Sequence, residues 1–360
     1  IANVALEYLG CEKGDYKQVN PNNDVNMAQS TNDSYPTAIR LGLLLGHDKL
    51  LLSLENLIAA FRVKAQAFEH VLKMGRTQLQ DAVPMTLGQE FQAFATTLEE
   101  DLCRLRTLVP ELLCEVNLGG TAIGTGINAD PSYQRLAVER LATISGHPVK
   151  SAVDLIEATS DMGDFVLFSG MLKRTAVKLS KICNDLRLLS SGPRTGINEI
   201  NLPARQPGSS IMPGKVNPVI PEAVNQVAFE IIGNDLTLTM AAEAGQLQLN
   251  VMEPIIAYKM FDSIRLLQRS MDMLRELCID DITANENHCL HLVEHSIGLV
   301  TALNPYIGYQ NSTRIAKKAL ESGRGILELV REEKLLEDDV LDDILKPHNM
   351  IPPRFVPVNS

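Results

Sequence analysis

Residues 207–218 carry the side-chain types best suited to chemistry. They read PGSSIMPGKVNP and lie between two long, largely apolar runs. Glycine and proline interrupt regular structure, which predicts a surface loop. Polar side chains gathered on one loop of a mostly apolar chain are typical of a functional site. The candidate residues of this loop are Ser209, Ser210, Lys215 and Asn217.

Two earlier segments offer the same kinds of hydrogen-bonding group. Residues 30–32 precede a predicted helix, and their simplest role is to cap its first turn. A helix N-terminus also presents free N–H groups, so this cluster can hold a carboxylate instead. Residues 76–84 form a polar connector, which is either a capped loop or a second set of donors. The candidates in these two segments are Ser30, Thr31, Asn32, Thr77 and Gln78.

The three segments together suggest a site for a small dianion. They hold hydroxyl and amide groups and one lysine, but no histidine and no Ser-His-Asp arrangement. Hydroxyls and amides bind carboxylate oxygens, and Lys215 supplies positive charge. If a proton is removed beside a carboxylate, the same donors stabilise the enediolate that forms. The base would then be a serine, which ionises only near positive charge and backbone N–H groups.

Helices must position these segments. Aromatic residues make up only 4% of the chain, tryptophan is absent, and strand-forming residues are too sparse for a large sheet. The 360 residues therefore predict an all-α fold in two or three packed parts. Residues 256–278 alternate three- and four-residue apolar spacings, as in a helix bundle. The other predicted helices are 1–9, one starting near Pro36, 54–72, 87–113, 131–144, 156–189 and 222–253.

The polar residues within 222–253 indicate burial in an oligomer, with satisfied hydrogen-bond partners. A net charge of −11 and the lack of a basic patch argue against nucleic acid as a partner. No apolar run is suited to spanning a membrane, and no signal peptide opens the chain. The six cysteines are scattered without a Cys-x-x-Cys pair, which indicates reduced thiols in a cytoplasmic protein.

Two other patterns are weaker candidates for sites. The glycine-rich residues 117–128 lack the lysine and the preceding strand of a nucleotide loop, so we expect a turn between helices. His288, His291 and His295 have helical spacing, with a metal site as one interpretation and a solvated helix face as the other. No second ligand cluster accompanies them, and the solvated face is favoured.

The candidate segments also resemble a known family. Residues 208–218 are similar to the signature of the aspartase/fumarase superfamily, and the form GKVNP resembles its fumarase and aspartase branch. Residues 29–33 and 75–82 resemble the other two signature regions, and the likeness extends over nearly the whole chain. The segments that resemble aspartases within the branch are 155–161, 198–203, 225–227 and 241–254.

The resemblance implies a carbon–nitrogen lyase in which Ser209 takes a proton from the β-carbon of L-aspartate, with Lys215 as the other catalytic residue. Loss of ammonia then gives fumarate without an organic cofactor, although some aspartases are activated by a divalent cation. The implied ligands of one carboxylate are Thr77, Ser210, Lys215 and Asn217. The implied ligands of the other carboxylate and the amino group are Ser30, Thr31 and Asn32.

The resemblance also implies a homotetramer, built on a central bundle of long helices, whose sites each combine segments from three subunits. The expected parts are a remnant of an N-terminal domain (1–31), the bundle (32–285) and a small C-terminal domain (286–360). We expect an N-terminally incomplete chain, because most of the family's first domain is absent, including a Ser-Gly-Thr segment that binds substrate.

Two alternatives remain open beside the aspartase interpretation. A class II fumarate hydratase would carry a histidine at the position of Gln78, paired with a glutamate that corresponds to Glu222. Gln78 cannot relay charge in such a pair, which favours the aspartase and makes Gln78 a substrate-binding candidate. The other alternative is a catalytically silent helical assembly protein of the same superfamily.

Overall fold

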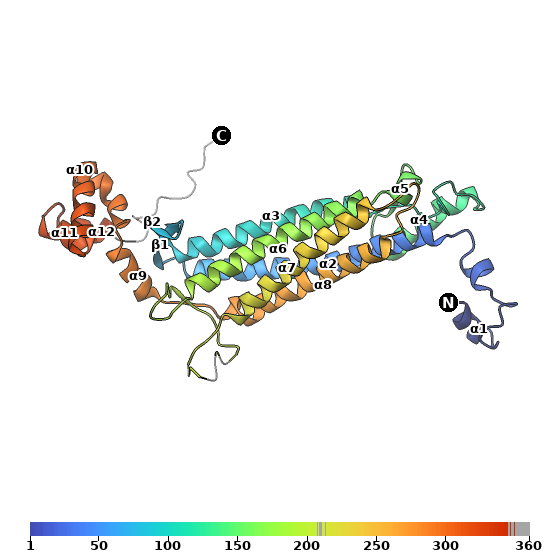
Figure 1. Ribbon diagram of the computed structural model, residues 1–360, viewed down its shortest axis with the longest axis horizontal. Coiled ribbons are helices and arrows are strands. Elements are labelled where there is room, and N and C mark those ends of the chain that lie inside the picture. The colour runs from blue at the N-terminus through green and yellow to red at the C-terminus, as the bar shows by residue number, and fades with distance from the viewer. Residues whose placement is uncertain (207, 209–210, 213, 345, 347–348, 350–360) are drawn as a thin grey trace. The chain divides into compact units, whose positions relative to one another are not determined.

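The computed structural model describes residues 1–206, 208, 211–212, 214–344, 346 and 349. Figure 1 shows the elements along the chain, coloured from blue at the N-terminus to red at the C-terminus. The helices are α1 (Ala2–Tyr8), α2 (Thr31–Ala67), α3 (Leu87–Leu113), α4 (Pro131–Ser145), α5 (Glu157–Ser160), α6 (Gly163–Leu189), α7 (Val219–Glu243), α8 (Glu253–Leu277), α9 (Glu286–His295), α10 (Leu299–Ser322), α11 (Ile326–Glu332) and α12 (Asp338–Ile344).

Strands are short and form two-stranded sheets in the described part of the chain. The strands and remaining turns of helix are β1 (Leu72–Thr77), β2 (Gln80–Thr86), β3 (Glu115–Val116), β4 (Lys150–Ser151), β5 (Ile200–Asn201), β6 (Thr283–Ala284), η1 (Pro21–Val25) and η2 (Ile279–Asp281). The predicted all-helical class is confirmed, because the long helices dominate both compact units.

The chain divides into two compact units. The first comprises Ile1–Leu54, Glu100–Val177 and Gln226–Arg269, and the second comprises Glu55–Glu99, Lys178–Asn225 and Ser270–Ser360. The long helices α2, α3, α6, α7 and α8 each contribute a part to both units.

The predicted apolar spacing of α8 is confirmed by burial of the whole stripe. Residues at three- and four-residue steps along this helix and just after it are withdrawn from solvent, as expected for one face of a bundle helix. The buried residues of the stripe are Ile256, Met260, Ile264, Leu267, Met271, Leu274 and Cys278. The predicted bounds of 87–113 agree with α3, and those of 131–144 agree with α4 within one residue.

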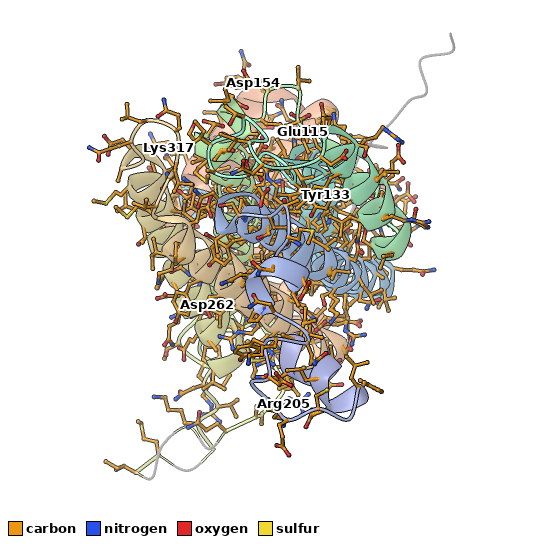
Figure 2. All side chains as sticks on the ribbon, turned by 90° about the vertical axis from the view of Figure 1, so that its right-hand side faces the viewer. Glu115, Tyr133, Asp154, Arg205, Asp262 and Lys317 are labelled. Atoms are coloured by element: carbon orange, nitrogen blue, oxygen red, sulfur yellow. The ribbon has the colours of Figure 1, made fainter. Side chains whose placement is uncertain are left out.

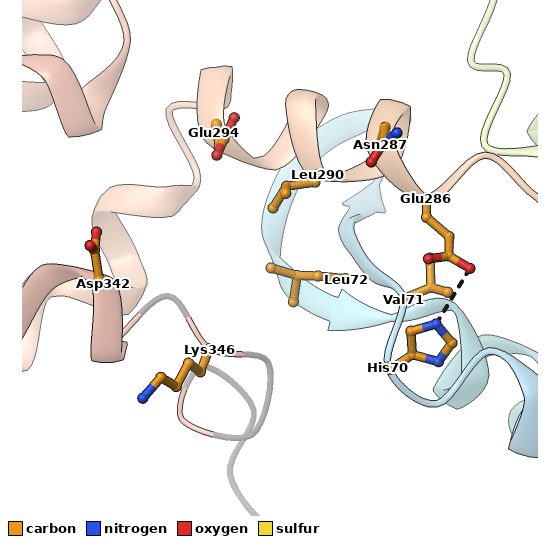
Figure 3. A pocket seen from close by; sticks show the side chains of 9 residues that line it. All are labelled: His70, Val71, Leu72, Glu286, Asn287, Leu290, Glu294, Asp342 and Lys346. Atoms are coloured by element: carbon orange, nitrogen blue, oxygen red, sulfur yellow. Dashed lines mark ion pairs between the residues drawn. The ribbon is translucent and has the colours of Figure 1, made fainter.

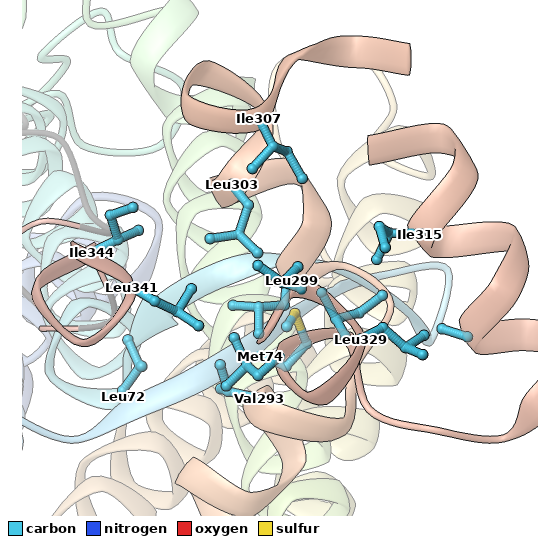
Figure 4. Packing of buried hydrophobic residues seen from close by; sticks show 14 residues of the cluster. Leu72, Met74, Val293, Leu299, Leu303, Ile307, Ile315, Leu329, Leu341 and Ile344 are labelled. Atoms are coloured by element: carbon cyan, nitrogen blue, oxygen red, sulfur yellow. The ribbon is translucent and has the colours of Figure 1, made fainter. Parts of the chain in front are cut away.

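A separate apolar cluster stabilises the C-terminal helices in the second unit. Leu72 and Met74 of β1 pack against buried residues of α9 to α12, such as Leu299 and Leu329 (Figure 4). In Figure 1 the hairpin of β1 and β2 accordingly lies beside α9. This packing fixes one face of the hairpin that carries the candidate residues Thr77 and Gln78.

The prediction for residues 54–84 was wrong in two respects. The helix ends at Ala67 rather than Leu72, and the polar connector is an antiparallel hairpin in which Thr77 pairs with Gln80. Its two turn residues, Gln78 and Leu79, have φ angles of 54° and 62°. Turns with two positive φ angles are usually marked by Asn-Gly or Asp-Gly, and Gln-Leu gives no such signal.

The predicted helix over 156–189 is divided. Asp161 adopts an extended backbone conformation between α5 and α6. Its carboxylate accepts a hydrogen bond from Gly163 N at 2.9 Å, which starts the new helix. Aspartate competes for backbone N–H groups in this way at helix ends, and apolar periodicity does not detect it.

The predicted continuous helix over 222–253 was also wrong. It ends at Glu243, and α8 starts at Glu253. Asn250 holds the connection by donating to the carbonyls of Ala241 at 3.0 Å and Ala242 at 3.1 Å. Leu247, with a φ of 57°, turns the chain between them. The absence of proline was therefore a poor guide to continuity.

Several polar residues of this stretch find their partners within the chain, although we expected burial in an oligomer. Asn234 donates to Ser263 Oγ at 3.1 Å, and the carboxylate of Asp235 accepts from Ser169 Oγ at 2.8 Å. Both residues are buried in the first unit. Their burial therefore needs no second subunit.

Candidate functional site

The first candidate segment begins helix α2 in the first unit. Ser30 Oγ accepts a hydrogen bond from Asn32 N at 3.1 Å, which confirms the predicted capping role. Asn32 Nδ2 donates to the Ala122 carbonyl at 2.8 Å. The exposed Thr31 Oγ1 lies 3.4 Å from Asn32 Oδ1. The segment is thus tied to the glycine-rich turn while Thr31 stays open to solvent.

A buried carboxylate joins this segment to the glycine-rich turn. Asp33 is 0% exposed. Its Oδ1 accepts from Ser30 N at 2.9 Å, and its Oδ2 accepts from Gly119 N at 3.1 Å and Thr121 N at 2.9 Å. Positive φ angles at Gly119 and Thr121 turn these N–H groups towards it. The turn thus binds a carboxylate of its own chain, which argues against a phosphate there.

The second candidate segment lies at the tip of the hairpin in the second unit. Thr77 and Gln78 are both exposed. Below them, Lys73 is 2% exposed and Glu199 is 0% exposed. Lys73 Nζ lies 2.8 Å from Glu199 Oε2, and Arg76 NH1 lies 2.7 Å from Glu199 Oε1. The exposed donors thus follow directly after a strand that is held by buried, charged side chains.

Glu90 completes this set of charges from α3. Its carboxylate pairs with the Lys73 ammonium, so two cations face two carboxylates. Burial alone would lower the pKa of Lys73, but Glu90 and Glu199 outweigh it and raise that pKa. Lys73 is therefore charged over the whole physiological range.

The third candidate segment is only partly described. Ser209 and Ser210 lie outside the described residues. Gly208 N donates to the Lys215 carbonyl at 2.9 Å, and Asn217 Nδ2 donates to the Gly208 carbonyl at 3.1 Å. A Cβ on Gly208 would lie 2.1 Å from the Lys215 carbonyl oxygen, so this close approach requires glycine.

Lys215 combines a fixed backbone with an exposed side chain. Its ammonium group forms no ion pair within the described ranges, so it is available to an anionic ligand. The N-terminal root of the loop is held by Arg205, labelled in Figure 2, which donates to Asp281 Oδ2 at 2.6 Å and to the Leu277 carbonyl at 2.8 Å. The loop thus has a firm base.

The predicted residues are distributed over both units. Residues 30–32 belong to the first unit, and the hairpin and the loop belong to the second. In the described part of the chain no hydrogen bond joins Thr77 or Gln78 to Lys215 or Asn217. The structure therefore describes the donors of each segment within its own unit.

The histidine cluster does not form a metal site in the described structure. His288 Nε2 lies 3.0 Å from the Ile197 carbonyl oxygen, and the rings of His291 and His295 contact each other at a tilt of 41°, with centroids 4.0 Å apart. Across the described residues, no group of three or more His, Cys, Asp and Glu side chains is placed to hold a metal ion. None of the described helices is long and apolar enough to cross a membrane.

A pocket of about 430 Å³ lies beside β1 and α9 in the second unit (Figure 3). An ion pair between His70 and Glu286, 3.3 Å apart, stands at one side of it. Leu72, Leu290 and Lys346 are among its other lining residues. None of the predicted site residues lines this pocket.

Lys73 and Glu199 were missed as supporting residues of the site by sequence reasoning. The signal was weak: a lysine in the otherwise apolar start of the hairpin, and a glutamate in a segment rich in polar residues. Only the structure shows that the two charges meet, because 126 positions separate them in the chain.

Comparisons with known proteins agree with the resemblance. A family model described as "Lyase" matches residues 1–233, and one described as "Fumarase C C-terminus" matches residues 299–352. An aspartate ammonia-lyase of Pseudomonas canavaninivorans is 81% identical over 360 residues, covering 100% of this chain and 76% of that relative. The aspartate ammonia-lyase of Escherichia coli K12 is 55% identical, covering 99% of this chain and 74% of that relative.

Solved structures show the same fold. A fumarate lyase:delta crystallin of Brucella melitensis bound to cobalt matches with a TM-score of 0.94 at 58% identity, over 98% of this chain and 76% of that chain. A class II fumarase of Schistosoma mansoni matches with a TM-score of 0.90 at 35% identity, over 97% of this chain and 76% of that chain. The chain belongs to the aspartase/fumarase superfamily of lyases.

Proposed function

We propose that this protein is a carbon–nitrogen lyase that converts L-aspartate reversibly to fumarate and ammonia. The observation that carries this proposal is the 81% identity, over the whole chain, to a relative named aspartate ammonia-lyase. The class II fumarase is more distant, at 35% identity. Gln78 at the hairpin tip supports the same choice, since it cannot form the His–Glu pair of a hydratase.

The proposed mechanism starts with Ser209 as the general base. It removes a proton from the β-carbon of aspartate, and the electron pair moves into the adjacent carboxylate to give an enediolate. Lys215 and the amide of Asn217 stabilise the added negative charge. The pair then returns to form the carbon–carbon double bond as the carbon–nitrogen bond breaks and ammonia leaves.

Substrate binding is proposed to use the remaining donors. Thr77, Gln78 and Ser210 join Lys215 and Asn217 on the carboxylate beside the reacting carbon. Residues 30–32 (Ser30, Thr31 and Asn32) hold the other carboxylate and the amino group. The exposure of Thr31, Thr77 and Lys215 supports these roles, because each side chain is open to a ligand.

Members of this superfamily need no prosthetic group, which agrees with the proposed chemistry, because the substrate's own carboxylate accepts the electrons. Activation by a divalent cation is a separate proposal that rests on the resemblance alone. Fumarate formation with and without Mg²⁺ at alkaline pH tests it. A rate that chelator leaves unchanged would rule it out.

Assembly into a homotetramer with sites shared between subunits is proposed from the family resemblance. Phe229, Leu236 and Met240 on α7 are large apolar residues that remain exposed in the single chain, which supports burial by another copy. The proposed parts remain 1–31, 32–285 and 286–360. A cytoplasmic location is proposed because the six cysteines are free, and four of them are buried.

One assay tests the proposed function. The full-length protein is mixed with L-aspartate or L-malate, and fumarate is followed by its ultraviolet absorbance. Fumarate from aspartate alone is the expected result. Fumarate from malate instead would favour a hydratase. No turnover of either substrate by a folded protein would favour a silent assembly protein.

A further inference from the structure

The hairpin that carries Thr77 and Gln78 is fastened from below by one buried carboxylate. Glu199 receives Lys73 at 2.8 Å on one oxygen and Arg76 at 2.7 Å on the other. Both cations are on β1, one on each side of the irregular position Gly75, where the strand register shifts. The contact to Arg76 is directly adjacent to the candidate residue Thr77.

We propose that Glu199 is a positioning residue that fixes the Thr77–Gln78 tip by joining β1 to the segment directly before β5. The proposal rests on the proposed function, in which this tip binds a substrate carboxylate. Glu199 itself is fully buried and touches no substrate. It acts through Lys73 and Arg76, and so through the strand that ends at Thr77.

The backbone of Glu199 is rigid enough to serve as the anchor. Its N–H donates to the Leu189 carbonyl at 2.8 Å, at the end of α6, and its carbonyl accepts from Asn285 N at 2.9 Å. The next two residues form β5, which pairs with β6. This short sheet precedes the loop of Lys215, so one residue links the base of the loop to the hairpin.

The hairpin needs such an anchor because its tip is strained and exposed. Neither Gln78 nor Leu79 is glycine, yet both have positive φ angles, which are unfavourable for residues with a Cβ. Exposed ends of short hairpins fray unless tertiary contacts oppose it. On the other strand, Asp81 accepts a hydrogen bond from Ser296 Oγ at 2.7 Å, which adds a second tertiary contact to the ion pairs of β1.

The ion pair between Glu199 and Arg76 also controls the charge presented to the substrate. In the ion pair with Glu199, the positive charge of the Arg76 guanidinium is balanced by the carboxylate, and the Arg76 side chain is only 16% exposed. Without Glu199, Arg76 can turn outward and compete for the same carboxylate as Thr77. Removing the buried charge would thus disturb both the position and the electrostatics of the tip.

Glu199→Gln is the direct test, because it keeps the shape and removes the charge. We expect faster backbone hydrogen exchange in residues 72–86 and unchanged exchange in α8. We also expect kcat/KM for L-aspartate to fall about 10- to 100-fold, as for a binding group misplaced by about 1 Å. The matched control is Glu139→Gln, which breaks an exposed pair with Arg135 and should change neither quantity.

A double-mutant cycle separates positioning from general destabilisation. If Glu199 acts through the tip, Thr77→Ala should cost kcat/KM less in the Glu199→Gln background than in the wild type. Independent, multiplicative losses would overturn the proposal. So would hairpin exchange that remains at the wild-type rate in Glu199→Gln, whatever happens to turnover.

Two safeguards keep the outcomes distinct. If the wild type forms no fumarate, the proposed function fails, and hydrogen exchange alone decides whether Glu199 anchors the hairpin. If Glu199→Gln does not fold, Arg76→Gln is measured with the same readouts, because it breaks the bridge at its less buried end. Wild-type exchange at 72–86 in that variant would equally contradict the proposal.

Discussion

Two fully buried carboxylates support two candidate donor segments, and they do so by different means. Asp33, beneath residues 30–32, is satisfied by three backbone N–H groups. Glu199, beside the strand that ends at Thr77, forms ion pairs with the side-chain cations of Lys73 and Arg76. The first anchor depends on the shape of a turn, and the second depends on matched charges.

The difference teaches which changes each segment tolerates. Backbone N–H groups stay in place when a side chain is replaced, so the Asp33 anchor fails only if its acceptor is lost. A buried ion pair leaves an uncompensated charge when either partner is removed. The hairpin should therefore be sensitive at three positions (Lys73, Arg76 and Glu199), whereas the helix start is sensitive mainly at one.

The largest expected effect is that of Lys73→Met. It removes the ammonium group that pairs with both Glu90 and Glu199, and we expect a loss of about 3 to 5 kcal/mol in the free energy of unfolding. Denaturant unfolding measures it. The control Lys150→Met breaks a pair between an exposed lysine and the half-buried Glu115, and it should cost at most about 1 kcal/mol. Equal losses in the two variants would contradict the expected difference between the buried and the more exposed ion pair.

A smaller loss is expected for Asp33→Asn. The amide retains one acceptor oxygen but turns an NH₂ group towards backbone N–H donors, which should cost about 2 kcal/mol. Asp130→Asn is the control, because Asp130 caps α4 at an exposed position, where asparagine caps equally well. Thermal unfolding compares the two. A wild-type midpoint for Asp33→Asn would contradict the proposed anchor.

Glu253 is another buried carboxylate, and it shows what burial does to ionisation. Its Oε1 has no hydrogen-bond partner in the described structure, and burial, opposed by Arg40, raises its pKa to about 7. The unfolded chain releases this proton near pH 4.5, so the folded state binds the proton more tightly between these pH values. This destabilises the folded state progressively as pH rises.

Glu253→Gln removes that penalty. We expect it to stabilise the protein by about 1 to 2 kcal/mol at pH 8, allowing for partial solvent screening, and to have little effect at pH 4.5. Unfolding midpoints at the two pH values provide the test. Stabilisation that is equal at both pH values would show that the effect is not one of ionisation.

The smallest expected effect is at the hairpin turn. Leu79→Gly removes a Cβ from a position with a φ of 62° and should stabilise the protein by about 0.5 to 1 kcal/mol. Leu9→Gly is a comparison at an exposed residue with ordinary negative φ (−82°), where glycine should bring no gain. A loss of stability in Leu79→Gly would mean that the turn is not strained.

Much of the fold was predictable, because apolar spacing marks helices such as α3 and α8 directly. The hairpin was not predictable, since its turn residues are Gln78 and Leu79 rather than glycine or asparagine. The break after Glu243 was missed because an asparagine side chain, that of Asn250, holds the connection and leaves no pattern in the surrounding apolar residues.

The candidate site was predictable as a set of residue types, but its supports were not. Hydroxyls, amides and Lys215 stand out in the chain, and the resemblance assigns them roles that remain predictions. The glycine-rich turn that meets Asp33 and the cations that meet Glu199 are far away in sequence. No local pattern reveals that Gly119 or Lys73 will meet them, so this level of organisation required coordinates.

The most direct test of the account is turnover by Ser209→Ala in the full-length protein. We predict that this variant forms no fumarate from L-aspartate above the uncatalysed rate, while its helix content and assembly match those of the wild type. Ser322→Ala, at the exposed end of α10, is the control and should retain full activity. Fumarate formed by Ser209→Ala at a rate near that of the wild type would contradict Ser209 as the base.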